Sequence, residues 1–313
     1  MNNPANTQKK LIAAGIDIGH SMVKIASGSH KIMFPSVAIP AFTISDQKTA
    51  EMAKRETVRV GGKDWFFGDT ALNQSQTWAT GLNDDWINSP EHCALILGAV
   101  KKLADLGVPA PDIVVAGLPI QAIKADPESK NRLAKQFEKL LPNTAISIVP
   151  QPYGAFCDIT LSDNGTPDPK NLAHMISWAV IDIGFYTTDF IIIKEGLWIE
   201  MASSSCPGIS LAAEHLVQSL ALRNIKINMA DADKALKTKF IPNFGKRIDI
   251  TEEANEALSI AASKIIDTAE RLFAPFVSRL NGVLVTGGGT PIVKDGLKEK
   301  WEHAVFPDNH RMT

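Results

Sequence analysis

One short pattern occurs twice in the chain, each time directly after an apolar run. The first copy reads GIDIGHSMVK from Gly15, and the second reads VIDIGFYTTD from Val180. In each copy an apolar run ends in aspartate, a glycine lets the backbone turn tightly, and a second apolar run follows. The backbone N–H groups of such a turn can face phosphate oxygens, and the aspartate can meet the accompanying cation. A single copy would be explained as an ordinary turn, but the repetition predicts two phosphate-binding hairpins.

The length and charge of the chain narrow its possible architectures and partners. With 313 residues, of which 45% are apolar, the chain favours two lobes or one large α/β domain. The formal net charge of −2 gives no global electrostatic reason to bind nucleic acid or an anionic membrane. We therefore expect no membrane partner and no direct contact with nucleic acid.

Cysteine spacing and hydropathy predict a cytoplasmic protein. Cys93, Cys157 and Cys206 are far apart and form no Cys-x-x-Cys pair or zinc-ligand pattern, which indicates reduced thiols. Residues 1–10 lack the apolar segment of a signal peptide, and no apolar stretch is long enough to span a membrane. We therefore expect a soluble protein in the cytoplasm.

The first half of the chain alternates strand-like and helix-like segments. Gly61 and Gly62 can supply the positive φ angles of a tight hairpin turn, and Ser89 is a good helix N-cap. The predicted elements are a strand over 31–37, a hairpin over 57–67, a helix from Ser89 to Gly107, a strand over 112–116, a helix over 127–141 and a strand over 145–149. Such alternation predicts a mainly parallel sheet covered by helices.

Residues 162–171 are rich in turn formers and are the best candidate for a linker. Beyond them the pattern restarts with the second hairpin. The predicted elements are a strand over 197–202, a turn over 203–208, helices over 209–222 and from 251 onward, and a strand over 283–285 that ends in glycines 287–289. These glycines allow close approach of a ligand, although a plain strand-to-helix turn would also explain them.

Five features stand in a fixed order: the first hairpin, Gln151 after a strand, the second hairpin, a Ser/Gly turn before a helix, and a strand ending in Gly-Gly-Gly. This order resembles the actin-like ATPase superfamily, and within it the plasmid-segregation actins of the ParM (StbA) type. The resemblance implies an α/β, actin-like (ribonuclease H-like) fold. It has two similar lobes, each a mixed β-sheet flanked by helices, with nucleotide in the cleft between them. The lobes are expected at 11–161 and 172–290, and the segment 291–313 is expected to return to the first lobe.

The resemblance also implies roles for single residues. Asp17 and Asp182 would hold Mg²⁺ through its waters, with turn capping as their ordinary alternative role. Lys24 would either neutralise phosphate charge or lie in solvent, and His20 would be a turn residue or a phosphate contact. The residues expected to bind ATP or ADP are Asp17, Gly19, His20, Ser21, Lys24, Asp182, Gly184, Thr187, Thr188, Gly208, Gly287, Gly288 and Gly289.

Gln151 separates two reaction classes. It stands where hydrolytic members of the superfamily place the residue that positions the attacking water, so the resemblance makes it the catalytic residue. An amide orients water but is a poor general base, which suits slow hydrolysis of ATP. A sugar kinase of this fold needs a carboxylate base instead, and Asp158 is better explained as a polar helix position.

The implied function is an ATPase that assembles into filaments with ATP and disassembles after hydrolysis. It would segregate plasmid DNA through a DNA-binding adaptor protein. Trp78, Trp86 and Trp301 could supply assembly contacts or could equally lie in the core. Two alternatives stay open, namely a nucleotide-switched chaperone or scaffold that does not polymerise, and a small-molecule kinase.

Overall fold

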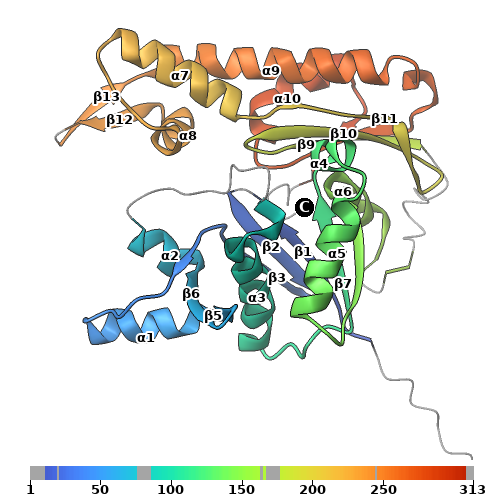
Figure 1. The fold of residues 1–313 in the computed structure, drawn as a ribbon. Helices are drawn as coiled ribbons and strands as arrows, with labels where there is room; N and C mark the ends of the chain where they lie inside the picture. Colours follow the sequence, from blue (N-terminus) through green and yellow to red (C-terminus); the bar gives the residue numbers. More distant parts are fainter. Residues whose placement is uncertain are drawn as a thin grey trace, which may run out of the picture. The chain divides into compact units, whose positions relative to one another are not determined.

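The structure, a computed structural model, describes residues 11–19, 21–75, 86–162, 165–166, 177–243 and 245–307. Contacts between residues divide the chain into two units (Figure 1). The first unit takes in the chain up to 116 together with 128–148. The second takes in 117–127 together with 149 onward. Each unit contains one five-stranded sheet.

The first unit is a sheet with strand order β3-β2-β1-β7-β8, in which β2 is antiparallel to β1 and β3 while β7 is parallel to β1. One face of its strands is buried and the other is partly exposed, as in a sheet covered on one side. Its elements are β1 (Ala13–Ile18), β2 (Met22–Ser27), β3 (His30–Pro35), β4 (Ala38–Pro40), α1 (Gln47–Arg55), β5 (Thr57–Val60), β6 (Lys63–Phe67), α2 (Gly68–Gln74), a 3₁₀ turn (Trp86–Asn88), α3 (Pro90–Asp105), β7 (Ile113–Leu118), α5 (Ser129–Leu140) and β8 (Ala145–Pro150).

The second unit repeats this topology with strand order β11-β10-β9-β14-β15. Here β10 is antiparallel to β9 and β11, and β14 is parallel to β9 and β15. Its elements are α4 (Ile120–Ala125), α6 (Gln151–Thr160), β9 (Ser177–Ile183), β10 (Thr187–Lys194), β11 (Leu197–Pro207), α7 (Ser210–Leu222), α8 (Met229–Thr238), β12 (Phe240–Asn243), β13 (Lys246–Asp249), α9 (Thr251–Phe273), a 3₁₀ turn (Val277–Arg279), β14 (Gly282–Thr286), α10 (Thr290–Lys300) and β15 (Ala304–Val305). The prediction of two similar lobes with mixed sheets is confirmed.

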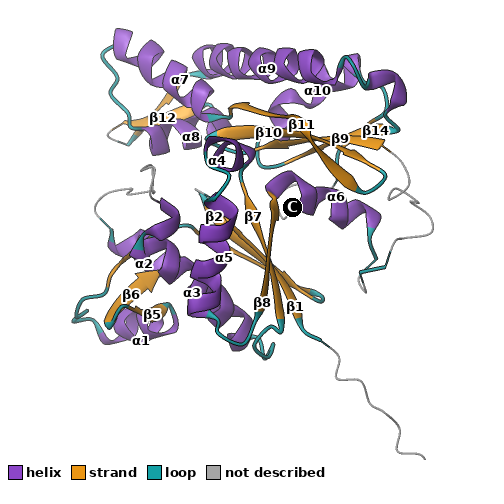
Figure 2. Ribbon diagram, turned by 45° about the vertical axis from the view of Figure 1, so that its right-hand side comes forward, coloured by secondary structure: helices purple, strands orange, loops and turns teal. Residues whose placement is uncertain are grey.

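Helices cover both faces of the second sheet (Figure 2). On one face α7, α9 and α10 pack on Ile181, Ile183 and Phe190, among other residues. On the other face α4 and α6 pack on Val180 and Ile191, among others. Since successive residues of a strand point to opposite faces, both covers together explain why β10 and β14 are apolar and buried almost throughout.

Each unit also carries an insertion after its third strand, which comes before the next long helix in the first unit and after α7 in the second. In the first unit the insertion is the small sheet β4-β6-β5 with α1 and α2. In the second it is α8 with the β12–β13 hairpin, placed between α7 and α9. The insertions therefore differ while the sheets that they interrupt agree.

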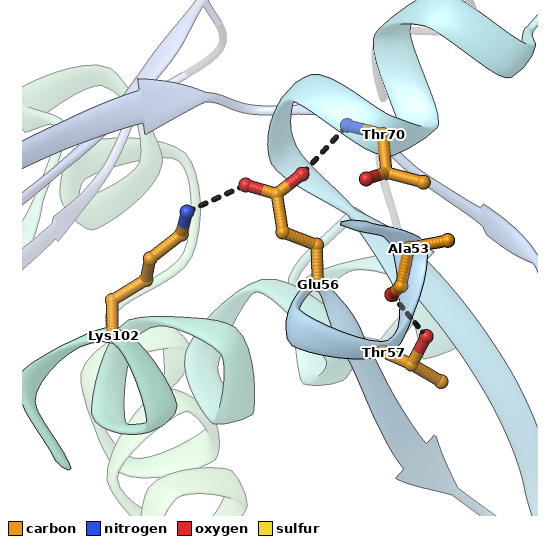
Figure 3. Close-up of polar contacts among 5 residues, drawn as sticks. All are labelled: Ala53, Glu56, Thr57, Thr70 and Lys102. Carbon is orange, nitrogen blue, oxygen red and sulfur yellow. Dashed lines mark hydrogen bonds and ion pairs between the residues drawn. The ribbon is translucent and has the colours of Figure 1, made fainter. Parts of the chain in front are cut away.

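A half-buried ion pair fixes the first insertion to α3 (Figure 3). The Lys102 ammonium on α3 lies 2.5 Å from Glu56 Oε1, and Glu56 Oε2 accepts a 2.7 Å hydrogen bond from the Thr70 N–H at the start of α2. Burial alone would raise the pKa of Glu56. The bonds from Lys102 and Thr70 outweigh that effect and hold the pKa below its ordinary value.

Several predicted elements are confirmed with small shifts at their ends. Gly61 and Gly62 take positive φ angles between β5 and β6, and the Ser89 hydroxyl accepts the His92 N–H at 3.1 Å at the start of α3. The turn expected over 203–208 is wrong for most of that range, because residues 204–207 pair with 187–190 and extend β11. Trp86 and Trp301 are half-buried, and Trp78 lies outside the described residues.

The two units differ from the expected lobe bounds. Segments 117–127 and 149–161, expected in the first lobe, pack on the second sheet through apolar residues of α4 and α6. Residues 291–307, expected to return to the first lobe, stay in the second unit because α10 joins its core and β15 extends its sheet. The expected linker over 162–171 lies largely outside the described residues. Within the described ranges, no helix is both long enough and apolar enough to cross a membrane.

Candidate functional site

The first hairpin, residues 17–24, turns on Gly19. The Gly19 N–H donates to the Met22 carbonyl at 3.2 Å, and a Cβ on Gly19 would lie only 2.9 Å from that oxygen. A side chain would therefore open the turn. Ser21 is exposed at its tip, as a phosphate-binding hydroxyl would have to be. His20 lies outside the described residues.

Asp17 and Lys24 face each other across this hairpin. They are directly opposite in the β1–β2 register, so their side chains lie on the same face of the sheet. The Lys24 ammonium is 3.5 Å from Asp17 Oδ2, and both side chains are largely buried. The contact of Lys24 with phosphate stays a prediction.

The second hairpin, residues 182–189, repeats the backbone geometry of the first. The Gly184 N–H donates to the Thr187 carbonyl at 2.9 Å, and a Cβ on Gly184 would lie 2.8 Å from the same oxygen. Asp182 is opposite Asp189, the register position that Asp17 and Lys24 occupy in the first hairpin. The two hairpins are thus copies in structure as well as in sequence.

The two threonines of the second hairpin have different surroundings. Thr187 is half-buried at the turn. Thr188 is fully buried and is opposite Ile183 and Cys206, both of which belong to the core under α7 and α9. The side chain of Thr188 lies on the sheet face covered by α7 and α9, and its contact with phosphate stays a prediction.

Three glycines from two turns pack against the second hairpin. A Cβ on Gly208 would lie 2.3 Å from the Gly184 carbonyl oxygen, and one on Gly287 would lie 2.4 Å from the Ile183 oxygen. Gly289 is equally constrained, since its Cβ would lie 2.3 Å from the Ile183 side chain. Backbone bonds join the same segments, among them Gly208 N–H to the Tyr186 carbonyl and Gly289 N–H to the Ile183 carbonyl. These three glycines therefore have a structural reason to be glycine.

Gly288 differs from its neighbours. It is exposed, a Cβ there would meet nothing within 4 Å, and its φ angle is outside the positive range that disfavours side chains. The described residues give no packing reason for a glycine at this position. An open surface over a backbone free of side chains is what the close approach of a ligand requires.

Gln151 is the first residue of α6, directly after β8. Ala155 and Phe156 anchor α6 on the face of the second sheet that also carries Val180 and Ile191. Asp182 and Asp189 share that face, because each is two residues along its strand from one of these apolar residues. The structure thus sets Gln151 on a helix that covers the sheet face of the second hairpin's aspartates. Asp158, the kinase-base alternative, is exposed farther along α6.

The Asp182 carboxylate is compatible with a cation that keeps its water shell. Among the described residues, no three His, Cys, Asp or Glu side chains group together as a metal site. Asp182 is half-buried beside the glycine turns, where a Cβ on Gly287 would come within 2.6 Å of its Oδ1. Mg²⁺ in nucleotide sites is commonly held by one or two carboxylates, waters and phosphate oxygens, and this donor set is compatible with that pattern.

Asp189 is absent from the residues expected to form the site. It is 3% exposed, and its Oδ2 accepts a 3.0 Å hydrogen bond from the Ile120 N–H at the start of α4. Its signal in the sequence is a carboxylate that ends the second motif inside an otherwise apolar strand. The identity of the partner could not be predicted, since it comes from a segment 69 residues away.

Two protein-family models match the chain. Residues 15–154 match the N-terminal domain of actin-like proteins, and residues 180–299 match the C-terminal domain of archaeal MreB-like actin homologues. The chain belongs to the actin-like superfamily. Each matched range begins at one hairpin strand, so the repeat described above corresponds to the two halves of this actin-like chain.

Solved structures share this fold over almost the whole actin-like chain. The archaeal actin homologue Ta0583 is 20% identical, with 96% of each chain covered and a TM-score of 0.74. A 15-stranded ParM filament from Clostridium botulinum is 19% identical, with 97% of this chain and 96% of that chain covered and a TM-score of 0.73. A MamK double helical filament is 18% identical, with 96% and 94% covered and a TM-score of 0.67. Ta0583 has also been solved in complex with ADP. No curated protein matches the chain.

Proposed function

We propose that this chain is a cytoplasmic ATPase that binds ATP with Mg²⁺ through its two hairpins and assembles with copies of itself into filaments. The repeated hairpin carries the proposal, because both copies keep the same Gly N–H to carbonyl bond at the same place in the same sheet topology. Members of the superfamily are generally ATPases, and relatives with this fold form filaments or bind ADP.

In this function the two hairpins supply backbone N–H groups to the phosphates. Lys24 adds a positive charge beside Asp17, and Asp182 is the carboxylate available to the waters of Mg²⁺. Mg²⁺ would neutralise the charge that develops on the phosphates. Gln151 would orient the attacking water without removing its proton, so hydrolysis would be slow.

The biological role that we propose is the segregation of plasmid DNA. The similar structures include ParM proteins, one of them from a filament and another described as a non-polymerisable quadruple mutant. With a net charge of −2, the chain has no global charge that would attract DNA. We therefore propose that a DNA-binding adaptor links the filament to the plasmid.

Gly288 offers a direct test of nucleotide binding. In Gly288→Val the added Cβ meets nothing within 4 Å in the protein, but the side chain would fill the space that a nucleotide needs. We expect the melting temperature to stay near that of the wild type and the affinity for Mg-ADP, measured by calorimetry, to fall at least about tenfold.

The matched control is Gly154→Ala on α6, which also adds carbon at an exposed glycine with nothing within 4 Å. We expect it to bind Mg-ADP as the wild type does. Equal affinities for wild type and Gly288→Val would contradict the placement of the nucleotide beside Gly288. A wild-type chain that binds neither Mg-ADP nor Mg-ATP would contradict the proposed function itself.

A further inference from the structure

Asp189 joins the second hairpin to a distant segment of the chain. It lies two residues beyond Thr187, whose carbonyl closes the hairpin turn, and it is opposite Asp182 in the β9–β10 register. Its side chain is buried, and its Oδ2 accepts the Ile120 N–H at 3.0 Å. Removing the acceptor would leave a buried backbone N–H without its hydrogen bond, which is costly, so this link is a strong one.

Asp189 bonds to segment 117–127, where the chain first enters the second unit. β7 belongs to the sheet of the first unit, next to β1, and the chain enters the second unit at Gly117. Residues 117–127 then return it to the first unit at Glu128. Any change in the position of this segment is therefore transmitted by the covalent chain to β7, the neighbour of the strand that ends in the first hairpin.

Three contacts seat this segment on the second unit. Ile120 is fully buried among the apolar residues under α4 and α6. Lys124 donates to the Ser203 carbonyl on β11. The bond to Asp189 is a polar contact of this segment with a residue of the hairpin itself, whereas the apolar partners Val180 and Ile191 lie on the strands that lead to it.

The first hairpin has a different residue at the corresponding position. Lys24 takes the place of Asp189 there, and it forms an ion pair with its own Asp17. The two copies of the repeat thus use the same register position differently. In the first copy the side chain at this position pairs with the aspartate of its own hairpin. In the second copy it accepts a hydrogen bond from segment 117–127.

We propose that Asp189 is a positioning residue through which the second hairpin sets the position of segment 117–127. The inference rests on the proposed function in that a nucleotide held by the hairpin is the signal. When nucleotide fixes residues 182–187, β10 and the Asp189 carboxylate are fixed with them. Through its bond to Asp189, the Ile120 N–H is then fixed as well, and with it α4 and segment 117–127.

Hydrogen exchange of the full chain, followed by mass spectrometry with and without Mg-ADP, tests this link. In the wild type, bound Mg-ADP is expected to slow exchange both in the hairpin and in 117–127, by about tenfold in the latter. Asp189→Ala is expected to keep the slowing in the hairpin and lose it in 117–127. Asp189→Asn keeps an oxygen that can accept the Ile120 N–H, so it is expected to behave as the wild type does.

Two further variants remove the donor instead of the acceptor. Ile120→Pro deletes the N–H at the first position of α4, where proline suits a helix, and Ile120→Val is its control for lost packing. Ile120→Pro is expected to lose the response of 117–127, and Ile120→Val to keep it. This pair decides the question if Asp189→Ala does not fold.

The outcomes separate this inference from the proposed function. If Asp189→Ala or Ile120→Pro keeps the Mg-ADP response of 117–127, Asp189 does not act as a positioning residue. The same conclusion follows if Asp189→Asn loses the response, because its charge and not its bond would then matter. If the wild-type hairpin shows no response to Mg-ADP or Mg-ATP, the proposed function is wrong. In that case the nucleotide-free samples still decide whether Asp189 holds the segment, through faster exchange of 117–127 in Asp189→Ala.

Discussion

Gln151 and Asp158 lie on the same helix and represent the two reaction classes that the sequence left open. Gln151 begins α6 directly after β8, whereas Asp158 is exposed two turns later. A residue that positions water must be fixed close to the phosphates, and the first residue of a packed helix is better fixed than an exposed one. For this reason we keep Gln151, and not Asp158, as the proposed catalytic residue.

Gln151→Ala is expected to lower the rate of ATP hydrolysis about 10- to 100-fold while the affinity for Mg-ATP stays within about twofold, because only the orientation of water is lost. Phosphate release and calorimetry measure the two quantities. Asp158→Ala on the same helix is the matched control and should hydrolyse ATP normally. A rate unchanged in Gln151→Ala, or one that collapses in Asp158→Ala, would show that the catalytic role is assigned to the wrong residue.

At the scale of single elements, the insertion β4-β6-β5 with α1 and α2 depends on one polar contact with α3. Lys102 pairs with Glu56 and lies 5.9 Å from the ring centroids of Phe34 and Phe67, and a Cβ on Gly98 of α3 would lie 2.7 Å from the Phe67 ring. The helix therefore approaches the insertion closely. The Glu56 carboxylate would lose its cation without Lys102, while its side chain stays largely buried.

Lys102→Met is expected to destabilise the protein by about 2–3 kcal/mol, since it removes one partner of a largely buried pair but keeps most of the apolar stem. Chemical denaturation measures the loss. Lys101→Met, on the neighbouring position of α3, is the control and should change stability by less than about 0.5 kcal/mol. Equal effects of the two substitutions would mean that the ion pair does not fix the insertion.

The same pair predicts a pH dependence. The pKa of Glu56 is lowered in the folded protein, so its contribution to stability is present at neutral pH and is lost as the pH falls through that lowered pKa. Because Lys102 is one cause of the lowering, the stability of Lys102→Met should fall less steeply in this acidic range than that of the wild type. Parallel pH profiles for the two proteins would contradict this reading of the contact.

Elements with a strong local signal could be predicted, whereas those made by tertiary contacts could not. The N-cap Ser89 predicts the start of α3, and the helix expected from 251 onward is α9, whose Ala261 and Ile265 are buried. β11 was predicted too short because its last residues, Ser203 to Pro207, look like a turn and form a strand only by pairing with β10. The two-residue strand β15 likewise exists only through its pairing with β14.

The residues of the candidate site likewise divide into those with a local sequence signal and those that depend on tertiary contacts. The glycine turns and both aspartates could be found in the sequence, since a backbone that turns tightly needs glycine whatever surrounds it. The burial of Thr188 depends on which face of β10 is covered by α7 and α9, and the bond of Asp189 depends on where α4 packs. Neither is visible until distant segments are brought together.

At the scale of the whole molecule, the same sheet topology occurs twice, but both segments that connect the two units belong to the second unit. Both 117–127 and 149–161 pack on the second sheet, which is covered on both faces, while the first sheet has one partly exposed face. The second unit thus holds the segments through which the chain passes between the units.

The most direct test of the central claim is sedimentation of the full chain with Mg-ATP, with Mg-ADP, and with ATP after Mg²⁺ is chelated, followed by electron microscopy of the pellet. The account predicts filaments with Mg-ATP, little or no pellet after chelation, and dispersal of the filaments as phosphate is released. Gly288→Val should stay in the supernatant, and Gly154→Ala should pellet with the wild type. A wild-type chain that binds and hydrolyses ATP yet stays in the supernatant at every protein concentration would contradict filament assembly.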